Sequence, residues 1–395
     1  MYNSVELFSG AGGLALGLSA AGFHHEVLIE WNPHACRTLR HNKRANYQPV
    51  SSWKIVEGDA RDFQFSSIRN SIDLVAGGPP CQPFSLGGKH QSYDDERDMF
   101  PVAIKAVREL RPKAFVFENV KGLLRTSFAD YLHYITLQLN HPDLVKGTKE
   151  GWENHLLRLE QERTTGYTSI MGYRTVIGLL NATDYGVPQK RERVFIVGFR
   201  NDLHTEWRCP IATHSEDALV WAKWITGEYW DEHQISKKER PSLTTVESAR
   251  IDRIEKKYGM FGPTTQRWRT VRDAISRLPG NPINHELRGG ARLYPGHTGS
   301  HIDEPAKALK AGDHGVPGGE NMVRYHDGSV RYFSVRESCR IQTFPDDFYI
   351  SGSWTEGMRQ VGNAVPVKLA QVVGNNIWQQ LEAVPLGQLE SEIVF

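Results

Sequence analysis

The chain has 395 residues, 39% of them hydrophobic and 24% charged, and a net charge of +1. At about 100–200 residues per domain this length predicts two or three domains, and the ordinary composition excludes a disordered or fibrous protein. No run approaches about 18 apolar residues, the first residues do not look like a signal peptide, and the four cysteines are far apart. We therefore expect a soluble, cytoplasmic protein without a disulfide framework or structural zinc, whose balanced charge neither supports nor excludes DNA binding.

Short apolar runs, each ended by Gly, Pro, Asp or Glu, alternate along the chain with stretches of helical spacing. The expected strands are 5–8, 26–29, 54–56, 72–76, 114–117 and 194–197, and helices are expected at 14–21 and 101–110. This alternation predicts an α/β fold with a doubly wound, parallel sheet, in which ligands bind at the carboxyl ends of the strands.

The alternation weakens between about residues 201 and 304, which predicts a second, smaller domain. Five of the ten tryptophans fall there: Trp207, Trp221, Trp224, Trp230 and Trp268. A final helix is expected from near Pro366, since proline suits a first helical turn. Its apolar face is formed by Leu369, Val373, Ile377 and Leu381.

The first candidate site is the turn Phe-Ser-Gly-Ala-Gly-Gly-Leu, directly after the first strand. Gly10 and Gly12 let the backbone approach a ligand, at which the N–H groups of the next helix point. Glu30 ends the second strand, where a carboxylate can bind ribose hydroxyls, and Trp31 offers a flat face for adenine. Asp59, after the third strand, is placed to accept from an exocyclic amine. These features predict a nucleoside cofactor, with a simple tight turn as the alternative; the glycine spacing is not the GxGxxG of NAD or FAD sites.

A second candidate site follows the fourth and fifth strands. Two prolines stiffen the chain before Cys81, which favours a nucleophile on a rigid turn over a buried structural cysteine. Glu118 ends the next strand and is expected to donate a proton, since burial raises a carboxyl pKa, with a solvated loop acid as the alternative. The basic run 189–193 precedes a buried strand, so its arginines are expected to point at the site. The run 360–366 alone predicts no more than a capped helix start.

Six segments, in this order, together resemble the motifs of the DNA (cytosine-5)-methyltransferases: 8–14, 79–85, 118–120, 189–193, 336–348 and 360–366. The resemblance runs from Leu7 to about Leu381 and is poorest in the middle. It implies a Rossmann-like methyltransferase sheet with a smaller DNA-recognition domain, S-adenosylmethionine as cofactor and double-stranded DNA as partner. It implies no metal.

The resemblance also implies a mechanism in which a thiolate adds to carbon 6 of a flipped-out cytosine, so that carbon 5 can take the methyl group. Cys81 would be the nucleophile, Glu118 would act at ring nitrogen 3, and Arg191 would contact the cytosine with support from Arg193. The residues expected to hold the cofactor are Phe8, Gly10, Gly12, Glu30, Trp31, Asp59, Ala60, Pro80 and Asn363.

DNA contacts are expected from two parts of the chain and from the basic run. The segment 85–99 resembles the family's mobile catalytic loop, whose cations meet phosphates. The segment 289–299 is rich in Gly and contains Arg292, and Arg288 directly precedes it. Both arginines are expected to be able to enter a DNA groove. The residues expected to contact DNA are Gln82, Ser85, Lys89, Arg97, Arg193, Arg288 and Arg292.

We expect a catalytic domain of residues 1–200 plus 335–395 and a target-recognition domain of residues 201–334, with the reading segment at roughly 280–310. The size resembles that of restriction-modification enzymes, so functional pairing with a restriction endonuclease and a monomeric state are expected. The segment 140–165 has no functional interpretation. Two alternatives stay open: a methyltransferase of the same fold that acts on transfer RNA, and a flavin- or NAD-binding protein without catalysis.

Overall fold

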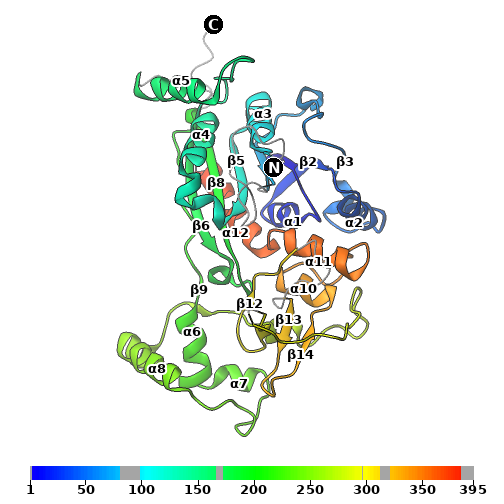
Figure 1. Ribbon diagram of the computed structural model, residues 1–395, viewed down its shortest axis with the longest axis vertical. Coiled ribbons are helices and arrows are strands. Elements are labelled where there is room, and N and C mark those ends of the chain that lie inside the picture. The colour runs from blue at the N-terminus through cyan, green and yellow to red at the C-terminus, as the bar shows by residue number, and fades with distance from the viewer. Residues whose placement is uncertain (1, 81–97, 166–171, 296, 312–320, 384–395) are drawn as a thin grey trace. The chain divides into compact units, whose positions relative to one another are not determined.

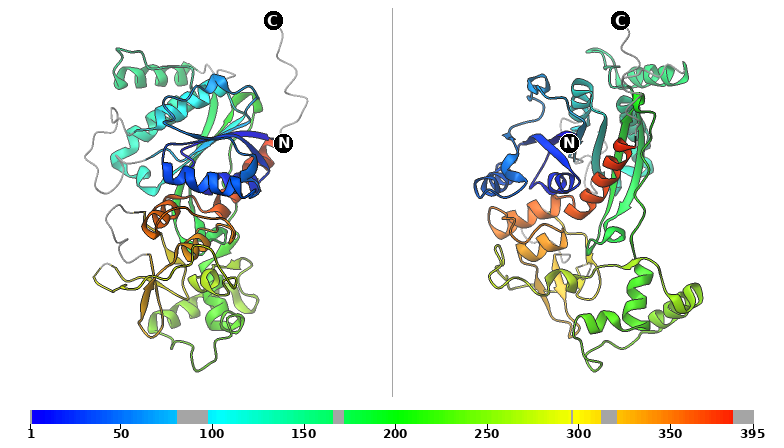
Figure 2. Two further views of the ribbon diagram at one scale, coloured as in Figure 1. Left: turned by 90° about the vertical axis from the view of Figure 1, so that its right-hand side faces the viewer. Right: turned by 180° about the vertical axis from the view of Figure 1, so that it is seen from behind.

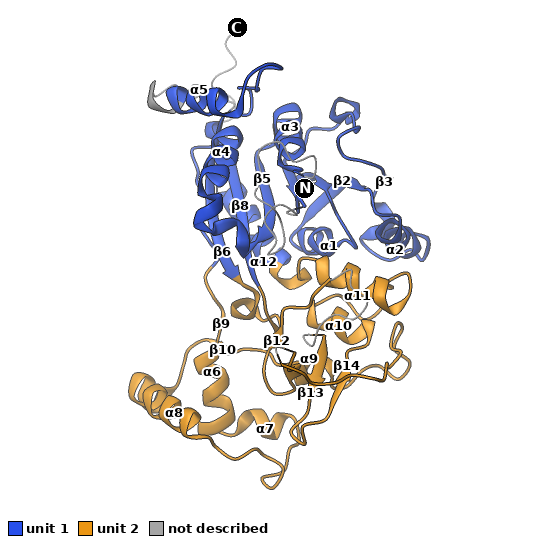
Figure 3. Cartoon of the chain, in the orientation of Figure 1, with its two compact units in different colours: residues 1–180, 192–210, 370–395 blue, residues 181–191, 211–369 orange. Residues whose placement is uncertain are grey.

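The structure is a computed structural model that describes residues 2–80, 98–165, 172–295, 297–311 and 321–383. The chain divides into two compact units, which Figure 3 shows in two colours. The first unit comprises Met1–Leu180, Glu192–Pro210 and Ala370–Phe395, and the second comprises Asn181–Arg191 and Ile211–Leu369. These boundaries differ from those of the expected domains, and the division of the chain into a catalytic and a recognition domain stays a prediction.

A seven-stranded sheet forms the centre of the first unit, in the order β3-β2-β1-β4-β5-β8-β6 (Figure 1). The strands are β1 (Tyr2–Leu7), β2 (Phe23–Glu30), β3 (Ile55–Glu57), β4 (Leu74–Gly77), β5 (Ala114–Val120), β6 (Tyr173–Asn181) and β8 (Glu192–Arg200). Strands β1 to β5 pair in parallel. The chain fills the β2–β3 side first and then the β4–β5 side, so the sheet is doubly wound, as predicted, and its switch point lies between β1 and β4.

The prediction of a wholly parallel sheet was wrong for β8, which pairs antiparallel with β5. A parallel neighbour needs a crossover of about a dozen or more residues, usually with a helix. Only residues 182–191 join β6 to β8, and they hold one turn of 3₁₀ helix and the short strand β7 (Gln189–Lys190). The chain therefore has no crossover helix there, and an antiparallel strand on a mostly parallel sheet is a common arrangement.

Helices cover both faces of this sheet, which Figure 2 shows from two further sides. They are α1 (Gly13–Ala20), α2 (Pro33–Arg44), α3 (Phe100–Leu110), α4 (Ala129–Asn140) and α12 (Val367–Glu382), while α5 (Trp152–Thr165) packs on α4. Side chains of α3 and α4, such as Phe100 and Ile135, share one apolar core with Val5 and Leu7 of β1. In the described part of the chain, no helix has the length and apolar character that a membrane crossing requires.

The C-terminal helix begins one residue after Pro366, as expected. The four residues of its predicted apolar face, Leu369, Val373, Ile377 and Leu381, are all buried. α12 packs against α1 so closely that a Cβ atom at Gly374 would lie 2.8 Å from the Cβ of Ala21. The segment therefore completes the first unit, although it comes last in the chain.

The second unit is built from short elements. Its strands are β7, β9 (His214–Ser215), β10 (Gln266–Arg267), β11 (Ser300–His301), β12 (Ala306–Lys307), β13 (Met322–Arg324) and β14 (Val330–Tyr332). Its helices include α6 (Glu216–Val220), α7 (Glu228–Glu232), α8 (Thr245–Tyr258), α9 (Val271–Ile275), α10 (Val335–Ile341) and α11 (Trp354–Asn363). Trp230 and Trp268 form an apolar core with Leu219, Ala222 and Tyr229, so these two tryptophans stabilise the unit itself.

Candidate active site

The sheet places the ends of four strands in one row. Leu7 of β1 pairs with Ile29 of β2 on one side and with Gly77 of β4 on the other, and Gly77 pairs with Phe117 of β5. The next residue of each strand or turn, namely Phe8, Glu30, Gly78 and Glu118, therefore follows at the same edge. Parallel strands present their carboxyl ends together, so the two candidate sites predicted from the sequence adjoin each other in the first unit.

The glycine-rich turn between β1 and α1 has the conformation that the sequence predicted. Gly12, which precedes α1, has φ +88°, and a Cβ atom there would lie 2.9 Å from Cδ2 of Leu39. Gly10 has φ +52°, and, its two chain neighbours apart, no described atom lies within 4 Å of the place where its Cβ would be. The left-handed conformation favours glycine at both positions. The backbone at Gly10 consequently borders open space that a ligand can occupy.

Glu30 holds this turn. Its Oε2 accepts a hydrogen bond from the backbone N–H of Gly10 at 2.7 Å, and its Oε1 accepts one from the N–H of Asn32 at 2.7 Å. Each carboxylate oxygen has two acceptor positions, so a bond to the backbone does not by itself exclude a second donor. The ring of Trp31, the next residue, is 71% exposed. A fixed carboxylate beside an exposed aromatic ring suits a nucleoside.

The carboxylate of Asp59, which the sequence predicts to accept from a ligand amine, already has a partner within the protein. It accepts hydrogen bonds from Nε of Arg61, at 3.0 and 3.1 Å, and from the backbone N–H of Arg61. The hydrogen bonds from the Arg61 guanidinium lower the pKa of Asp59. An amine of a ligand would therefore share this carboxylate with Arg61. Ala60 is buried beside it, and Pro80 is exposed.

Glu118 forms a buried ion pair with Arg193. Oε1 of Glu118 lies 2.7 Å from Nε of Arg193, and both side chains are largely buried. The antiparallel pairing of β5 with β8 brings them together, because Val120 is opposite Arg193. Gly78 adjoins the pair, since a Cβ atom there would lie 3.5 Å from Oε2 of Glu118. The acid at the end of β5 is thus in contact with the segment that leads to the predicted nucleophile.

Asn119 fixes the same segment. Its side-chain amide donates a hydrogen bond to the backbone carbonyl of Pro79 at 3.2 Å, and its Oδ1 accepts from the N–H of Val120 at 2.8 Å. This bond holds the backbone two residues before Cys81. Cys81, Gln82, Ser85, Lys89 and Arg97 themselves lie outside the described residues.

Arg191 lies in the second unit and is only 2% exposed. Its guanidinium donates to three main-chain carbonyl groups: that of Leu309 at 3.2 Å, of Gly362 at 2.8 Å and of Ala364 at 3.1 Å. Gln189 supports the same region by accepting from the N–H of Leu309 at 2.9 Å. Arg191 therefore holds the backbone on both sides of Asn363.

The segment around Asn363 is tightly packed, which its sequence alone did not predict. A Cβ atom at Gly362 would lie 2.8 Å from the carbonyl carbon of Lys310, so only glycine fits there. Asn363 is the last residue of α11, and its side chain is exposed. The amide of Asn363 is consequently presented on a rigid helix end.

The two arginines expected to read DNA lie in a segment without regular structure in the second unit. Both are exposed. The guanidinium carbon of Arg288 is 4.9 Å from the ring centre of Trp354, which holds this side chain against α11. The segment also exposes Leu287, Leu293 and Tyr294.

Three features of the site were missed from the sequence. The clamp by Asn119 could have been suspected from an amide that directly follows a strand-end acid. The contact of Gly78 with Glu118 and the pairing of Arg193 with Glu118 depend on how β4, β5 and β8 are aligned, which no local pattern reveals.

Comparison with known proteins supports one family. The family model described as "C-5 cytosine-specific DNA methylase" matches residues 2–143 and 167–379. The chain is 33% identical over 393 residues to the type II methyltransferase M.PspPI of Psychrobacter sp. (strain TA137), which covers 97% of this chain and 80% of that protein. It is 32% identical over 381 residues to the type II methyltransferase M.NgoMIV of Neisseria gonorrhoeae, which covers 96% of this chain and 98% of that protein.

Solved structures share the fold at lower identity. A putative DNA modification methyltransferase encoded within an Escherichia coli prophage has a TM-score of 0.58 and 19% identity, over 97% of this chain and 100% of that one. The Dnmt2 methyltransferase of S. pombe has a TM-score of 0.53 and 18% identity, over 97% of this chain and 99% of that one.

Proposed function

We propose that the chain uses S-adenosylmethionine, Cys81 and Glu118 to modify a flipped-out cytosine in one double-stranded sequence. The premise is that the chain belongs to the C-5 cytosine-specific DNA methylase family and is an enzyme that methylates carbon 5 of cytosine in DNA. The observation that carries this assignment is the row formed by the glycine turn, Glu30 and the Glu118–Arg193 pair at one sheet edge.

The residues at the switch point fit an S-adenosyl group. Glu30 would accept the ribose hydroxyls while it holds the N–H groups of Gly10 and Asn32, and Trp31 would stack on the adenine. The open space at Gly10 leaves room for the ligand beside the backbone N–H groups of the turn. Phe8, Gly12, Asp59, Ala60, Pro80 and Asn363 are proposed to complete this site. The bound cofactor would supply an electrophilic methyl group to carbon 5 of the cytosine.

Cys81 is proposed to make carbon 5 reactive. Its thiolate would form a bond to carbon 6, and the displaced electron pair would move into the ring. Glu118 would donate a hydrogen bond or proton to ring nitrogen 3, where negative charge develops. After methylation, carbon 5 would lose its proton to a base, the bond from sulfur to carbon 6 would break, and the electron pair would return to Cys81. The clamp of Asn119 on Pro79 would keep the nucleophile's segment beside Glu118.

The two arginines of the basic run are proposed to have different roles from those that the resemblance implied. Arg193 is the one that contacts Glu118, so we assign it to the cytosine site, where its guanidinium orients the carboxyl group and faces the base. Arg191 is committed to three main-chain carbonyls, so its role is to hold the segment that carries Asn363.

The name "type II methyltransferase" of the relatives supports a role in restriction-modification. We propose that methylation protects host DNA from a partner endonuclease that cuts the same sequence. Within the chain, residues 201–334 are proposed to select that sequence, with Arg288 and Arg292 among the reading residues. The monomeric state and the cytoplasmic location stay predictions.

Expression in a methylation-free Escherichia coli host, followed by bisulfite sequencing of its DNA, tests the proposal. We expect protected cytosines within one short sequence, and no protection with a Cys81→Ala variant made as control. Methylated RNA without methylated DNA, or cytosines methylated without sequence preference, would contradict it.

A further inference from the structure

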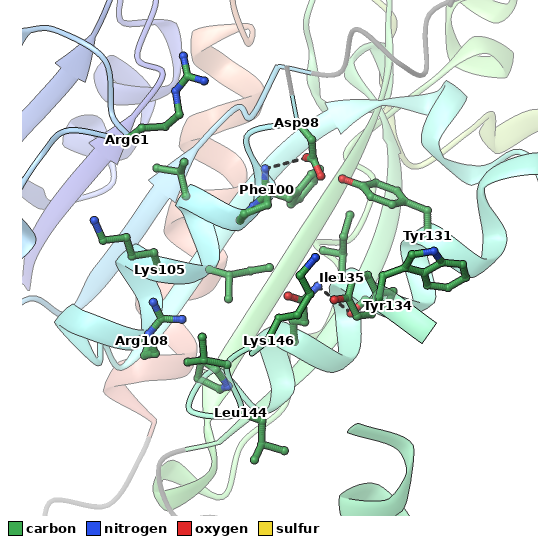
Figure 4. A pocket seen from close by; sticks show the side chains of 17 residues that line it. Arg61, Asp98, Phe100, Lys105, Arg108, Tyr131, Tyr134, Ile135, Leu144 and Lys146 are labelled. Atoms are coloured by element: carbon green, nitrogen blue, oxygen red, sulfur yellow. Dashed lines mark hydrogen bonds between the residues drawn. The ribbon is translucent and has the colours of Figure 1, made fainter. Parts of the chain in front are cut away.

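A cavity of about 390 Å³ lies in the first unit, and its described lining residues include none of those assigned to methyl transfer (Figure 4). Its walls are α3, α4 and the segment 142–152, for which the sequence suggested no function. The volume falls within the range of small-molecule pockets, roughly 300–1,000 Å³. Its inner surface is apolar, with Phe100, Ile104, Tyr131 and Ile135 on the side of the core.

The segment 142–152 covers this cavity as a fixed structure. His155 of α5 is buried, and its Nε2 lies 2.8 Å from the carbonyl oxygen of Leu144 while its Nδ1 lies 2.7 Å from the hydroxyl of Tyr134. A carbonyl only accepts, so Nε2 carries the proton and Nδ1 accepts from Tyr134; burial, which lowers the pKa of His155, favours this neutral form. Arg158 also donates to the carbonyl of Val145 at 2.8 Å. The cavity is therefore preformed.

Cations surround the opening. Arg61, Lys105 and Arg108 lie along one side in Figure 4, and Lys146 lies across from them. Among the described lining residues Asp98 is the one carboxylate, and it accepts the backbone N–H of Phe100 at 3.0 Å. Within the described part of the chain, Lys105, Arg108 and Lys146 take part in no ion pair. An apolar interior behind a cationic rim fits a ligand with a flat ring at one end and an anionic group at the other.

We propose that this cavity binds a nucleoside diphosphate, with its base on the apolar wall of α3 and α4 and its phosphates on Lys105, Arg108 and Lys146. A phosphate alone would leave the apolar wall unused, and a nucleoside alone would leave the cations uncompensated. The ligand is a small molecule, distinct from DNA and from the methyl donor.

Arg61 connects the cavity to the methyl-transfer site. It lines the cavity and also bonds the carboxylate of Asp59, which is assigned to the cofactor. Phosphates in the cavity attract Arg61 and so weaken its bond to Asp59, which leaves that carboxylate available to the cofactor's amine. Occupation of the cavity thus raises the affinity for S-adenosyl ligands; this coupling, unlike the binding itself, rests on the proposed function.

Calorimetry with GDP on the full chain, saturated with S-adenosylhomocysteine so that the cofactor site is filled, tests the binding. We expect a dissociation constant tighter than about 1 mM, and binding at least about tenfold weaker for guanosine and for inorganic pyrophosphate. The double variant Lys105→Ala/Arg108→Ala should lose about tenfold or more in GDP affinity. Lys54→Ala, which removes an exposed cation elsewhere in the same unit, should bind GDP as the wild type does.

Three outcomes would overturn the proposal: no GDP binding, equal binding of pyrophosphate, or unchanged GDP affinity in the double variant. The coupling is measured separately, as the affinity for S-adenosylhomocysteine with and without GDP. We expect it to rise at least threefold in the wild type and to be unaffected by GDP in Arg61→Gln. An unchanged affinity in the wild type would refute the coupling while leaving the binding result to stand on its own.

Discussion

Nε of Arg193 lies 2.7 Å from Oε1 of Glu118, near the carboxyl end of β5, where β5 pairs antiparallel with β8. The acid assigned to ring nitrogen 3 of the cytosine thus has a guanidinium partner in the protein before any base arrives. One oxygen of Glu118 is oriented by Arg193, and the other faces the Gly78 side, toward the segment that carries Cys81. This orientation reduces the reorganisation that the carboxyl group needs when the base binds.

Glu118→Gln should lower kcat by roughly a hundred- to ten-thousand-fold, the usual range for a general acid or base. The amide keeps the size of the side chain but cannot transfer a proton to ring nitrogen 3. Single-turnover methylation measures the effect, and calorimetry with S-adenosylhomocysteine provides the control, because the cofactor residues are unchanged. A rate within threefold of the wild type would remove Glu118 from the mechanism.

Arg193→Lys and Arg191→Lys form a matched pair of charge-conserving changes. Lysine cannot keep the planar, multiple hydrogen bonds of either arginine. Arg193→Lys keeps a positive charge beside Glu118 but not the same hydrogen bond, so its main effect should be a lower kcat, with a smaller loss of stability than in Arg191→Lys. Arg191→Lys leaves buried carbonyls without donors, which costs about 1–3 kcal/mol for each lost bond, so its main effect should be a lower free energy of unfolding.

Urea denaturation and single-turnover kinetics on both variants separate these roles. Because Arg191 holds the backbone around Asn363, its variant should also bind S-adenosylhomocysteine more weakly. If Arg191→Lys were as stable as the wild type and lost only kcat, the original assignment of Arg191 to the cytosine would be restored.

The glycine turn and the strand-end acids could be predicted from the sequence because each depends on neighbours in the chain. Gly10, Gly12 and Glu30 act through a turn and the strand beside it, so their spacing carries the information. The roles of Arg191 and Arg193 could not be separated in the same way. They are two residues apart in the same basic segment. Only the positions at which β7 ends and β8 begins determine that Arg193 contacts Glu118 and that Arg191 contacts Gly362.

The edge strand β6 was missed for a related reason. Its apolar residues come as two pairs, Val176-Ile177 and Leu179-Leu180, with Gly178 between them, so Tyr173–Asn181 lacks the continuous apolar run that marked the central strands. The sequence does not decide the role of the tryptophans of the second unit, because an aromatic residue in a weakly patterned segment suits a core and a binding surface equally. Trp230 and Trp268 proved to be core residues.

Cys81→Ser should abolish methyl transfer, because a hydroxyl is far less ionised than a thiol at neutral pH. Affinity for S-adenosylhomocysteine should change little, since the residues proposed for the cofactor are intact. The wild type should also form a covalent complex with duplex DNA that carries 5-fluorocytosine, because fluorine replaces the proton that must leave carbon 5. Mass spectrometry would identify the linked residue, and an adduct at any residue other than Cys81, or none, would contradict the mechanism.

The stability of the first unit should fall as the pH drops from about 6.5 toward 4. His25 is fully buried, and burial lowers its pKa to about 4 from the ordinary 6.5. Between these values the unfolded chain binds a proton that the folded chain excludes, so the contribution of His25 is complete above about pH 6.5 and is lost as the pH falls through the folded pKa. A shift of this size corresponds to about 3 kcal/mol.

NMR titration of the His25 ring checks this prediction directly, and urea denaturation at pH 7.5 and 5 checks its effect on stability. Nε2 of His25 donates to the carbonyl of Ala15, and its Nδ1 lies 2.9 Å from Ser4 Oγ, so His25→Asn keeps polar contacts there without a titratable group. This variant should show a smaller loss of stability between the two pH values. A ring that titrates near 6.5 in the folded protein would refute the prediction.

The exposed arginines of the second unit should decide which DNA sequence is modified. An arginine paired to guanine in the major groove contributes about 1–3 kcal/mol of discrimination, so Arg292→Ala should relax the preference at one base pair by about tenfold or more. The guanidinium of Arg288 contacts the ring of Trp354, and such a cation–π contact at an exposed site contributes only about 0.5–1 kcal/mol. Bound DNA can therefore displace this contact, or the contact can orient Arg288 toward the DNA. Methylation across a randomised duplex library measures both variants, with Arg44→Ala, an exposed arginine of α2, as the control. Unchanged site preference in Arg288→Ala and Arg292→Ala would move recognition to another part of the second unit, and the segment 237–257, with its exposed Lys237, Lys238 and Lys256, would be the next to test.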